Sequence, residues 1–265
     1  MVGEIEGEGP GILLCHGLSA TRRYVVHGSR YLPRRGYRLV TYDARGHGQS
    51  DPAATYDYGG LAGDLDLVID STLAMDSGGA VLGGHSMGCH TVTRRALADP
   101  EGIRALVLIG PVFIGEADAD SRWDRRADAL ERGGPEAFAE VVAENSPGAK
   151  ARETVYRLAR DRARLHLHPE AVAQALREVP RSSPFRSLEE LANLRMPVLI
   201  VASHDEFDPG HPRQVAERWA EVIPGAELIG EAKGQSPLAW QGGLLSREIE
   251  SFLNRHSLGP GGSDG

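Results

Sequence analysis

Cysteine, lysine and long apolar runs are scarce in this chain of 265 residues. The two cysteines, Cys15 and Cys89, each stand in an apolar stretch, so we expect buried, reduced thiols and no disulfide framework. No C-x-x-C pair and no close group of histidines and cysteines occurs, so neither a metal site nor a cofactor site is predicted.

Membrane and export signals are also lacking. No apolar run reaches the roughly 20 residues that a membrane-spanning helix needs. Residues 1–10 are acidic and rich in glycine, which differs from the basic and then apolar pattern of a secretory signal peptide. We therefore expect a cytoplasmic protein that does not bind membranes.

The charge balance excludes a second class of partner. The net charge is −8 and the sequence pI is near 5.7, which disfavours binding to nucleic acid or to an anionic membrane. Of the 29 basic residues only Lys150 and Lys233 are lysines. The arginines are scattered among acidic residues, as in 118–132 and 152–164, so we expect solvated helix faces and a small-molecule partner.

The most informative motif is the pentapeptide G-H-S-M-G at residues 84–88. It follows an apolar strand predicted at 80–83 and precedes a helix predicted at 89–98. A serine in a tight turn between a strand and a helix projects its hydroxyl above the sheet, and flanking glycines prevent collisions there. The helix N-terminus also offers N–H groups to a developing oxyanion. Ser86 is therefore a candidate nucleophile.

Strands and helices alternate through most of the chain, which predicts a mostly parallel sheet with helices on both faces. Further strands are predicted at 11–15, 37–42, 105–109, 198–202 and 226–231. Further helices are predicted at 21–35, 61–75, 212–222 and 244–254. In such a sheet, a ligand binds outside the carboxyl ends of the strands.

The alternation is interrupted at 112–185, where four helices are predicted at 121–132, 135–144, 149–167 and 169–179. An all-helical insertion between two strands predicts a lid over the ligand crevice. The core then comprises 1–111 and 186–258 as one discontinuous domain. Residues 259–265 are expected to form a disordered tail.

Four motifs in this order resemble those of the α/β-hydrolase fold family, over nearly the whole chain. They are H-G-L at 16–18, D-x-R-G-H-G-x-S at 43–50, the pentapeptide at 84–88, and the loop at 203–209. The resemblance implies an α/β-hydrolase fold with Ser86 as the nucleophile. It further implies that Leu18 and Met87 supply the N–H groups of the oxyanion hole.

The resemblance places the triad acid in the loop at 203–209, where two aspartates are available. In the family the acid usually precedes a proline by four residues, and Pro209 then selects Asp205. Asp208 remains the alternative.

The base position departs from the family pattern. The family carries its histidine in the loop after the last strand, where this chain has Gln235. A neutral amide cannot take the proton of a serine. His211, at the reactive edge of the sheet, is the candidate replacement. His16, His85 and Gln235 are candidates for the wall of the substrate pocket.

These residues predict a serine-dependent hydrolase of a small ester, thioester or lactone whose base has moved. Two alternatives stay open because of Gln235. One is a non-hydrolytic enzyme of the same fold, such as a cyclase or lyase, which uses the pocket to orient a reactive substrate. The other is a catalytically silent ligand-binding protein. The sequence does not indicate the substrate or the oligomeric state.

Overall fold

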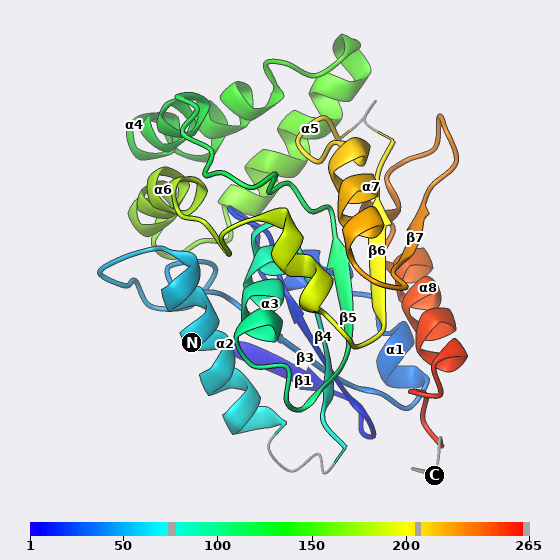
Figure 1. The fold of residues 1–265 in the computed structure, drawn as a ribbon. Helices are drawn as coiled ribbons and strands as arrows, with labels where there is room; N and C mark the ends of the chain where they lie inside the picture. Colours follow the sequence, from blue (N-terminus) through cyan, green and yellow to red (C-terminus); the bar gives the residue numbers. More distant parts are fainter. Residues whose placement is uncertain (74–77, 205–207, 262–265) are drawn as a thin grey trace.

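A seven-stranded sheet forms the centre of the protein in the computed structural model, which describes residues 1–73, 78–204 and 208–261 (Figure 1). The strands are β1 (Gly3–Glu6), β2 (Gly11–Cys15), β3 (Arg38–Tyr42), β4 (Ala80–His85), β5 (Ile103–Ile109), β6 (Val198–Ala202) and β7 (Glu227–Gly230). Their order across the sheet is β1-β3-β2-β4-β5-β6-β7. Only β1 is antiparallel to its neighbour, with Gly3 opposite Tyr42.

Helices cover both faces of the sheet, and each face has its own buried apolar cluster. On one face, Leu65, Val92 and Trp219 belong to α2 (Tyr58–Thr72), α3 (Met87–Ala98) and α7 (Arg213–Val222). On the other face, Leu32 and Phe252 belong to α1 (Tyr31–Arg34) and α8 (Gly242–Arg255). The central strands are buried on both faces, which explains why they read as continuous apolar runs.

The predicted helical insertion lies between β5 and β6. Its helices are α4 (Arg122–Ala143), α5 (Gly148–Ala163) and α6 (Pro169–Glu178), which lie together at one end of the sheet (Figure 1). They share an apolar cluster, and Leu18, just beyond the carboxyl end of β2, packs against it. The insertion therefore lies over the edge of the sheet where β2 and β4 end.

Two of the four predicted insertion helices are joined into one kinked helix. Gly134 interrupts α4 with φ 68° and ψ −162°, a conformation that glycine adopts without a steric penalty. Pro135 follows it and begins the second segment. The separation predicted at residues 133–134 is thus a kink within α4.

The helix predicted at 21–35 is wrong. This segment contains the short helix η1 (Arg22–Tyr24) and then α1, with turns between them. His27 and Gly28 have positive φ values of 48° and 69°, which a right-handed helix cannot contain. The remaining short helices are η2 (Val179–Arg181), η3 (Leu188–Asn193) and η4 (Leu238–Trp240).

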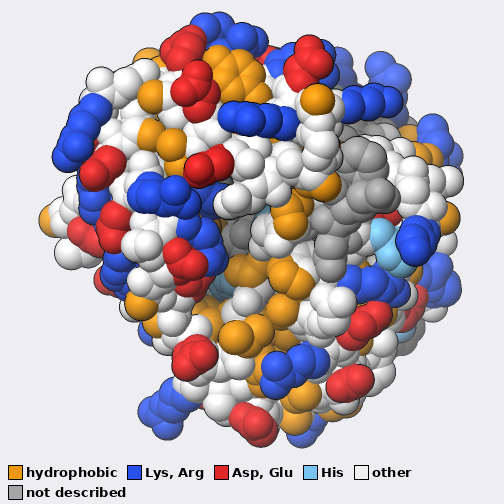
Figure 2. All heavy atoms as spheres, turned by 90° about the horizontal axis from the view of Figure 1, so that it is seen from above, with side chains coloured by type: hydrophobic (Ala, Val, Ile, Leu, Met, Phe, Trp, Pro, Cys, Tyr) orange, Lys and Arg blue, Asp and Glu red, His pale blue; other side chains and the backbone are white. Residues whose placement is uncertain are grey.

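The surface over the insertion carries interspersed charges of both signs (Figure 2). Arg177 pairs with Asp128 and Glu131, and Arg164 pairs with Glu136. None of the described helices has the length and apolar character to span a membrane. These arginines of the insertion therefore form part of a solvated, ion-paired surface at this end of the molecule.

Candidate active site

Ser86 occupies the sharp turn between β4 and α3. Its backbone has φ 52° and ψ −112°, a strained conformation for a residue with a side chain. The main-chain N–H of Ser86 donates to the carbonyl of Ile109 at 2.9 Å. This bond fixes the turn to the end of β5.

The glycines on either side of Ser86 are required by close packing. A Cβ atom on Gly84 would lie 2.3 Å from the carbonyl carbon of Gly88. A Cβ atom on Gly88 would lie 2.3 Å from the main-chain oxygen of Cys15. Both distances are far below van der Waals contact, so the turn can form only with glycine at these two positions.

The loop after β2 lies against this turn. A Cβ atom on Gly17 would be 3.4 Å from the Cβ atom of Ser86, and the next residue is Leu18. Among the described residues, no acceptor is found for the N–H of Leu18. Met87 is the first residue of α3, so its N–H has no acceptor within the helix. Leu18 and Met87, the two residues expected to supply the N–H groups of the oxyanion hole, thus both lie next to Ser86.

His16 supports this loop from inside the protein. Its Nε2 accepts a hydrogen bond from the N–H of Ala44 at 2.9 Å, so Nδ1 carries the proton and donates to the carbonyl of Gly17 at 2.8 Å. Burial, with a smaller effect from His47, lowers the pKa of His16 to about 3. The neutral ring, only 2% exposed, therefore connects two backbone segments instead of facing a substrate.

A histidine of the insertion holds the same loop from the other side. Nδ1 of His166 accepts from the N–H of Gly48 at 2.8 Å, and its Nε2 donates to the carbonyl of Ser19 at 3.2 Å. Burial lowers the pKa of His166 to about 3 as well. Ser19 has a positive φ of 58°, and the histidine holds this strained residue in place.

The candidate base is paired with an acid three residues before it. Nδ1 of His211 lies 2.8 Å from Oδ1 of Asp208, the distance of a charge-assisted hydrogen bond. Burial acts to raise the pKa of Asp208, but the neighbouring His211, with smaller effects from His85 and Arg162, outweighs it, so the pKa lies below its ordinary value. The ionised carboxylate therefore accepts the proton of Nδ1, and Nε2 is left to act as a base.

Contacts through β5 place His211 next to the serine turn. The ring of His211 packs on Gly110, where an added Cβ atom would lie 3.1 Å from Cδ2. Gly110 follows Ile109, whose carbonyl accepts the N–H of Ser86. The ring is also 4.7 Å from the ring of His85, centroid to centroid. The structure thus places the ring of His211 against His85, the residue before the candidate nucleophile Ser86.

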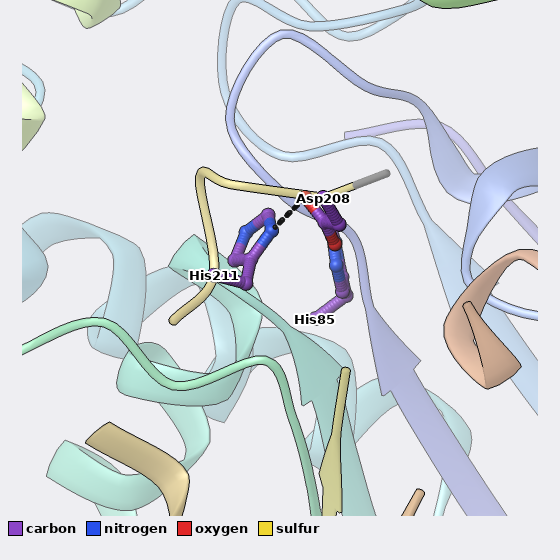
Figure 3. A group of neighbouring side chains, drawn as sticks. All are labelled: His85, Asp208 and His211. Atoms are coloured by element: carbon purple, nitrogen blue, oxygen red, sulfur yellow. Dashed lines mark hydrogen bonds and ion pairs between the residues drawn. The ribbon is translucent and has the colours of Figure 1, made fainter. Parts of the chain in front are cut away.

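His85 completes a three-residue cluster with Asp208 and His211 (Figure 3). One potential ligand atom from each residue lies within 4.8 Å of the other two. Nε2 of His85 is buried and has no hydrogen-bond partner among the described residues. Burial, reinforced by the neighbouring His211, lowers the pKa of His85 to about 3. Two imidazoles and a carboxylate are also a donor set that binds Zn²⁺ or Fe²⁺.

The loop after β7 has a structural role. Gln235 is exposed, and its N–H bonds to the carbonyl of Ala232 at 3.0 Å. Glu231, which is buried, accepts hydrogen bonds from the side chain of Ser203 and the N–H groups of His204 and Leu238. This carboxylate ties the loop after β6 to the loop after β7. The sequence analysis missed it because nothing distinguishes it from a surface acid.

Asp205, the acid favoured by the sequence, lies outside the described residues. Asp208, the alternative, is described and accepts the hydrogen bond of His211. A signal for this pair was available in the sequence, because the two residues stand three positions apart in a turn. The family pattern, which separates acid and base into different loops, pointed away from it.

Comparisons with known proteins agree with this arrangement of strands, helices and turns. The family model described as alpha/beta hydrolase fold matches residues 10–241. A protein of Agrobacterium fabrum, provisionally named as the carbamate hydrolase RutD, is 31% identical over 229 residues, which cover 85% of each chain.

Two solved structures have the same fold. An esterase from Thermogutta terrifontis gives a TM-score of 0.77 at 23% identity, covering 96% of this chain and 93% of the esterase. An enol-lactonase from Burkholderia xenovorans LB400 gives a TM-score of 0.72 at 21% identity, covering 97% and 95%. At these low sequence identities, the two structures show that the fold is shared, and they show nothing about activity.

Proposed function

The chain belongs to the alpha/beta hydrolase fold family, and on that premise we propose that it is a serine-dependent hydrolase of a small ester, thioester or lactone. Ser86 is the nucleophile, His211 the base and Asp208 the acid. The observation that supports this best is the 2.8 Å hydrogen bond between His211 and Asp208, next to the serine turn. The relationship to a protein named as a carbamate hydrolase favours the same class, because carbamates, like esters, are attacked at a carbonyl carbon.

Acylation begins when Oγ of Ser86 attacks the substrate's carbonyl carbon. The serine proton passes to Nε2 of His211, because Nδ1 is held by Asp208. The carbonyl oxygen becomes an oxyanion that accepts hydrogen bonds from the N–H groups of Leu18 and Met87. The proton then passes from His211 to the leaving oxygen or sulfur, which departs and leaves an acyl-serine ester.

In deacylation, water is the nucleophile and Oγ of Ser86 is the leaving group. Water gives a proton to Nε2 of His211 as its oxygen attacks the acyl carbon. The second oxyanion occupies the same site beside Leu18 and Met87. When the bond to Ser86 breaks, the proton returns to Oγ, and the product leaves as a carboxylic acid. No step uses Gln235.

The helical insertion acts in this proposal as a lid. Leu18 packs against the apolar cluster of α4, α5 and α6, and His166 bonds to Ser19 from the same insertion. Closing such a cover excludes water from the oxyanion site and strengthens its hydrogen bonds.

We place the protein and its small-molecule substrate in the cytoplasm.

Hydrolysis of a small panel tests the proposal: p-nitrophenyl acetate and butyrate, a butyryl thioester and γ-butyrolactone. We expect turnover of at least one compound by the wild-type protein. Ser86→Ala is expected to lower kcat/KM by a factor on the order of 10³ or more. Ser251→Ala, an exposed serine on α8, is the matched control and keeps full activity.

Two outcomes contradict the proposal. Turnover that survives in Ser86→Ala excludes a serine nucleophile. Binding of these compounds without turnover by the wild-type protein favours the non-hydrolytic enzyme or the silent binding protein, for which Gln235 in place of the usual histidine is the supporting feature.

A further inference from the structure

A small cavity lies beside the serine turn, between the insertion and the core. Its walls include Gly17, Tyr24, His85, Arg162 and Trp240, and its volume is about 30 Å³. A buried water needs roughly 10–15 Å³ of such space. The cavity therefore has room for about two waters. The two oxygens of a carboxylate group need a similar volume.

Arg162, near the end of α5, contributes a positive charge to this cavity. Its Nε donates to the carbonyl of Leu158 at 3.2 Å, in its own helix. Its guanidinium carbon lies 5.8 Å from the ring centroid of Tyr24. Across the described residues, no carboxylate forms an ion pair with it. Arg162 is mostly buried, and this burial lowers the pKa of its guanidinium, while Tyr24 and Asp208 oppose the shift.

Neighbouring arginines on the same segment behave differently. Arg160 pairs with Asp161 at 2.8 Å, and Arg164 pairs with Glu136 on α4. These pairs lie at the surface, where an ion pair contributes little to stability. Of these three arginines, Arg162 is the one that faces inward and has no ion-pair partner among the described residues. A mostly buried charge without an ion-pair partner is unfavourable, and an anionic ligand would offset this cost.

The groups around Arg162 offset its charge only in part. No described aspartate or glutamate lines the cavity. Asp208 is close enough for its charge to act on Arg162, but its carboxylate is already bonded to His211. His85, on the cavity wall, is held neutral. The cavity is therefore small and carries a positive charge, which suits a single carboxylate.

We propose that Arg162 binds a carboxylate of the substrate, so that the enzyme acts on acyl compounds that carry a free carboxylate a few bonds from the scissile carbonyl. The guanidinium fork matches the two oxygens of a carboxylate. Gly17 and His85 line the cavity and also flank Ser86, which places the bound carboxylate close to the nucleophile. The substrate class rests on the proposed hydrolase function, whereas the anion site does not.

The first experiment compares two esters that differ mainly in charge. The p-nitrophenyl hemiester of succinate carries a carboxylate where p-nitrophenyl butyrate has a methyl group. For the wild-type protein we expect the higher kcat/KM with the hemiester. Arg162→Gln is expected to lower the ratio of the two kcat/KM values roughly 10- to 100-fold, and Arg162→Lys is expected to retain part of the preference.

Arg157→Gln is the matched control. It removes one positive charge from an exposed position of the same helix and leaves the ratio at the wild-type value. A purely structural role of Arg162 would lower both kcat/KM values together and leave their ratio unchanged. That result, or an equal loss of the ratio in Arg157→Gln, overturns the proposal.

The second experiment measures binding without turnover. Calorimetry follows sodium succinate, the neutral succinamide and inorganic phosphate binding to Ser86→Ala and to Ser86→Ala/Arg162→Gln. Succinate should bind the first protein at least tenfold more tightly than the second, and more tightly than the other two compounds bind. Equal binding of phosphate, or succinate binding that is unaffected by Arg162→Gln, overturns the carboxylate site.

Together the experiments separate the two proposals. Arg162-dependent binding of succinate, without hydrolysis of any ester, overturns the proposed function and keeps the anion site. Ser86-dependent hydrolysis with no Arg162-dependent preference for the charged ester keeps the proposed function and overturns the anion site.

Discussion

Asp208 accepts a hydrogen bond from Nδ1 of His211 at 2.8 Å, and the main-chain N–H of His211 bonds to the carbonyl of Asp208 at 3.1 Å. The acid and the candidate base are therefore fixed to one another within a single turn. In the family pattern these two residues come from different loops. In the proposed mechanism, this short-range pair supplies the acid and base beside Ser86, while Gln235 lies in an exposed turn after β7.

Replacing the acid by its amide tests whether the pair is catalytic. In Asp208→Asn the side chain loses its charge and no longer fixes the proton of His211 on Nδ1. We expect kcat on the best ester to fall by about 10²–10⁴-fold, with a native circular dichroism spectrum. Glu217→Gln, which removes an exposed carboxylate on α7, should retain wild-type kcat. Full activity in Asp208→Asn would exclude Asp208 as the acid.

The packing around two glycines predicts that their replacement by alanine changes the free energy of unfolding in opposite directions. Gly88→Ala places a Cβ atom 2.3 Å from the oxygen of Cys15, so the free energy of unfolding should fall by at least about 2–3 kcal/mol. Gly63→Ala, within α2 and exposed, meets nothing within 4 Å and should raise it by about 0.5–1 kcal/mol. Urea unfolding measures both. A neutral result for Gly88→Ala would contradict the close approach of α3 to β2.

Four buried or mostly buried histidines predict how stability depends on pH. Burial lowers the folded-state pKa of His16, His85, His90 and His166 to about 3, whereas an unfolded histidine titrates near 6.5. Below that pH the unfolded state binds more protons than the folded state, so acid favours unfolding. The stability is present at neutral pH and is lost as the pH falls from about 6.5 towards 3.

Each of these histidines contributes a slope of up to about 1.4 kcal/mol per pH unit. Urea unfolding should therefore show a loss of several kcal/mol between about pH 7 and pH 5. A flat stability profile over this interval would mean that these rings become protonated in the folded protein. His90→Gln should make the profile shallower, because it removes one of the four groups.

The central elements of the fold could be predicted from the sequence. The strand Val198–Ala202 has the predicted bounds, because a strand that is buried on both faces must be apolar throughout. The turn at Ser86 could also be predicted, since its G-x-S-x-G motif between a strand and a helix is a local pattern. Its packing could not be predicted, because Gly88 is required by contact with the distant Cys15. β1 was missed because most of its residues, including Glu4, are exposed, so it has no apolar pattern.

The contacts that define the site were less accessible to sequence reasoning. His85 and His211 lie far apart in the chain, and their rings come to 4.7 Å because β4, β5 and β6 lie side by side in the sheet. Arg162 is one of many arginines in the insertion, and its inward direction depends on how α5 meets the core. Patterns of charge and spacing reveal neither relationship.

The cluster of His85, Asp208 and His211 predicts inhibition by zinc. Its donor atoms lie within 4.8 Å of one another, so a Zn²⁺ ion bound there would occupy the base and its acid. We expect added Zn²⁺ to inhibit ester hydrolysis reversibly, with full recovery on adding EDTA. His85→Ala should weaken the inhibition. Activity that needs Zn²⁺, or that EDTA abolishes, would assign these residues to a metal-dependent mechanism instead.

The rate at which a fluorophosphonate labels Ser86 tests the central claim most directly, because this reagent reports an activated serine without knowledge of the substrate. Intact mass spectrometry would follow the wild-type protein, His211→Gln and Gln235→Ala. We expect prompt labelling of the wild type, a rate lower by about 10²-fold or more in His211→Gln, and a rate close to wild type in Gln235→Ala. Equal labelling of the wild type and His211→Gln, or an unlabelled wild type, would contradict the claim that His211 replaces the missing base.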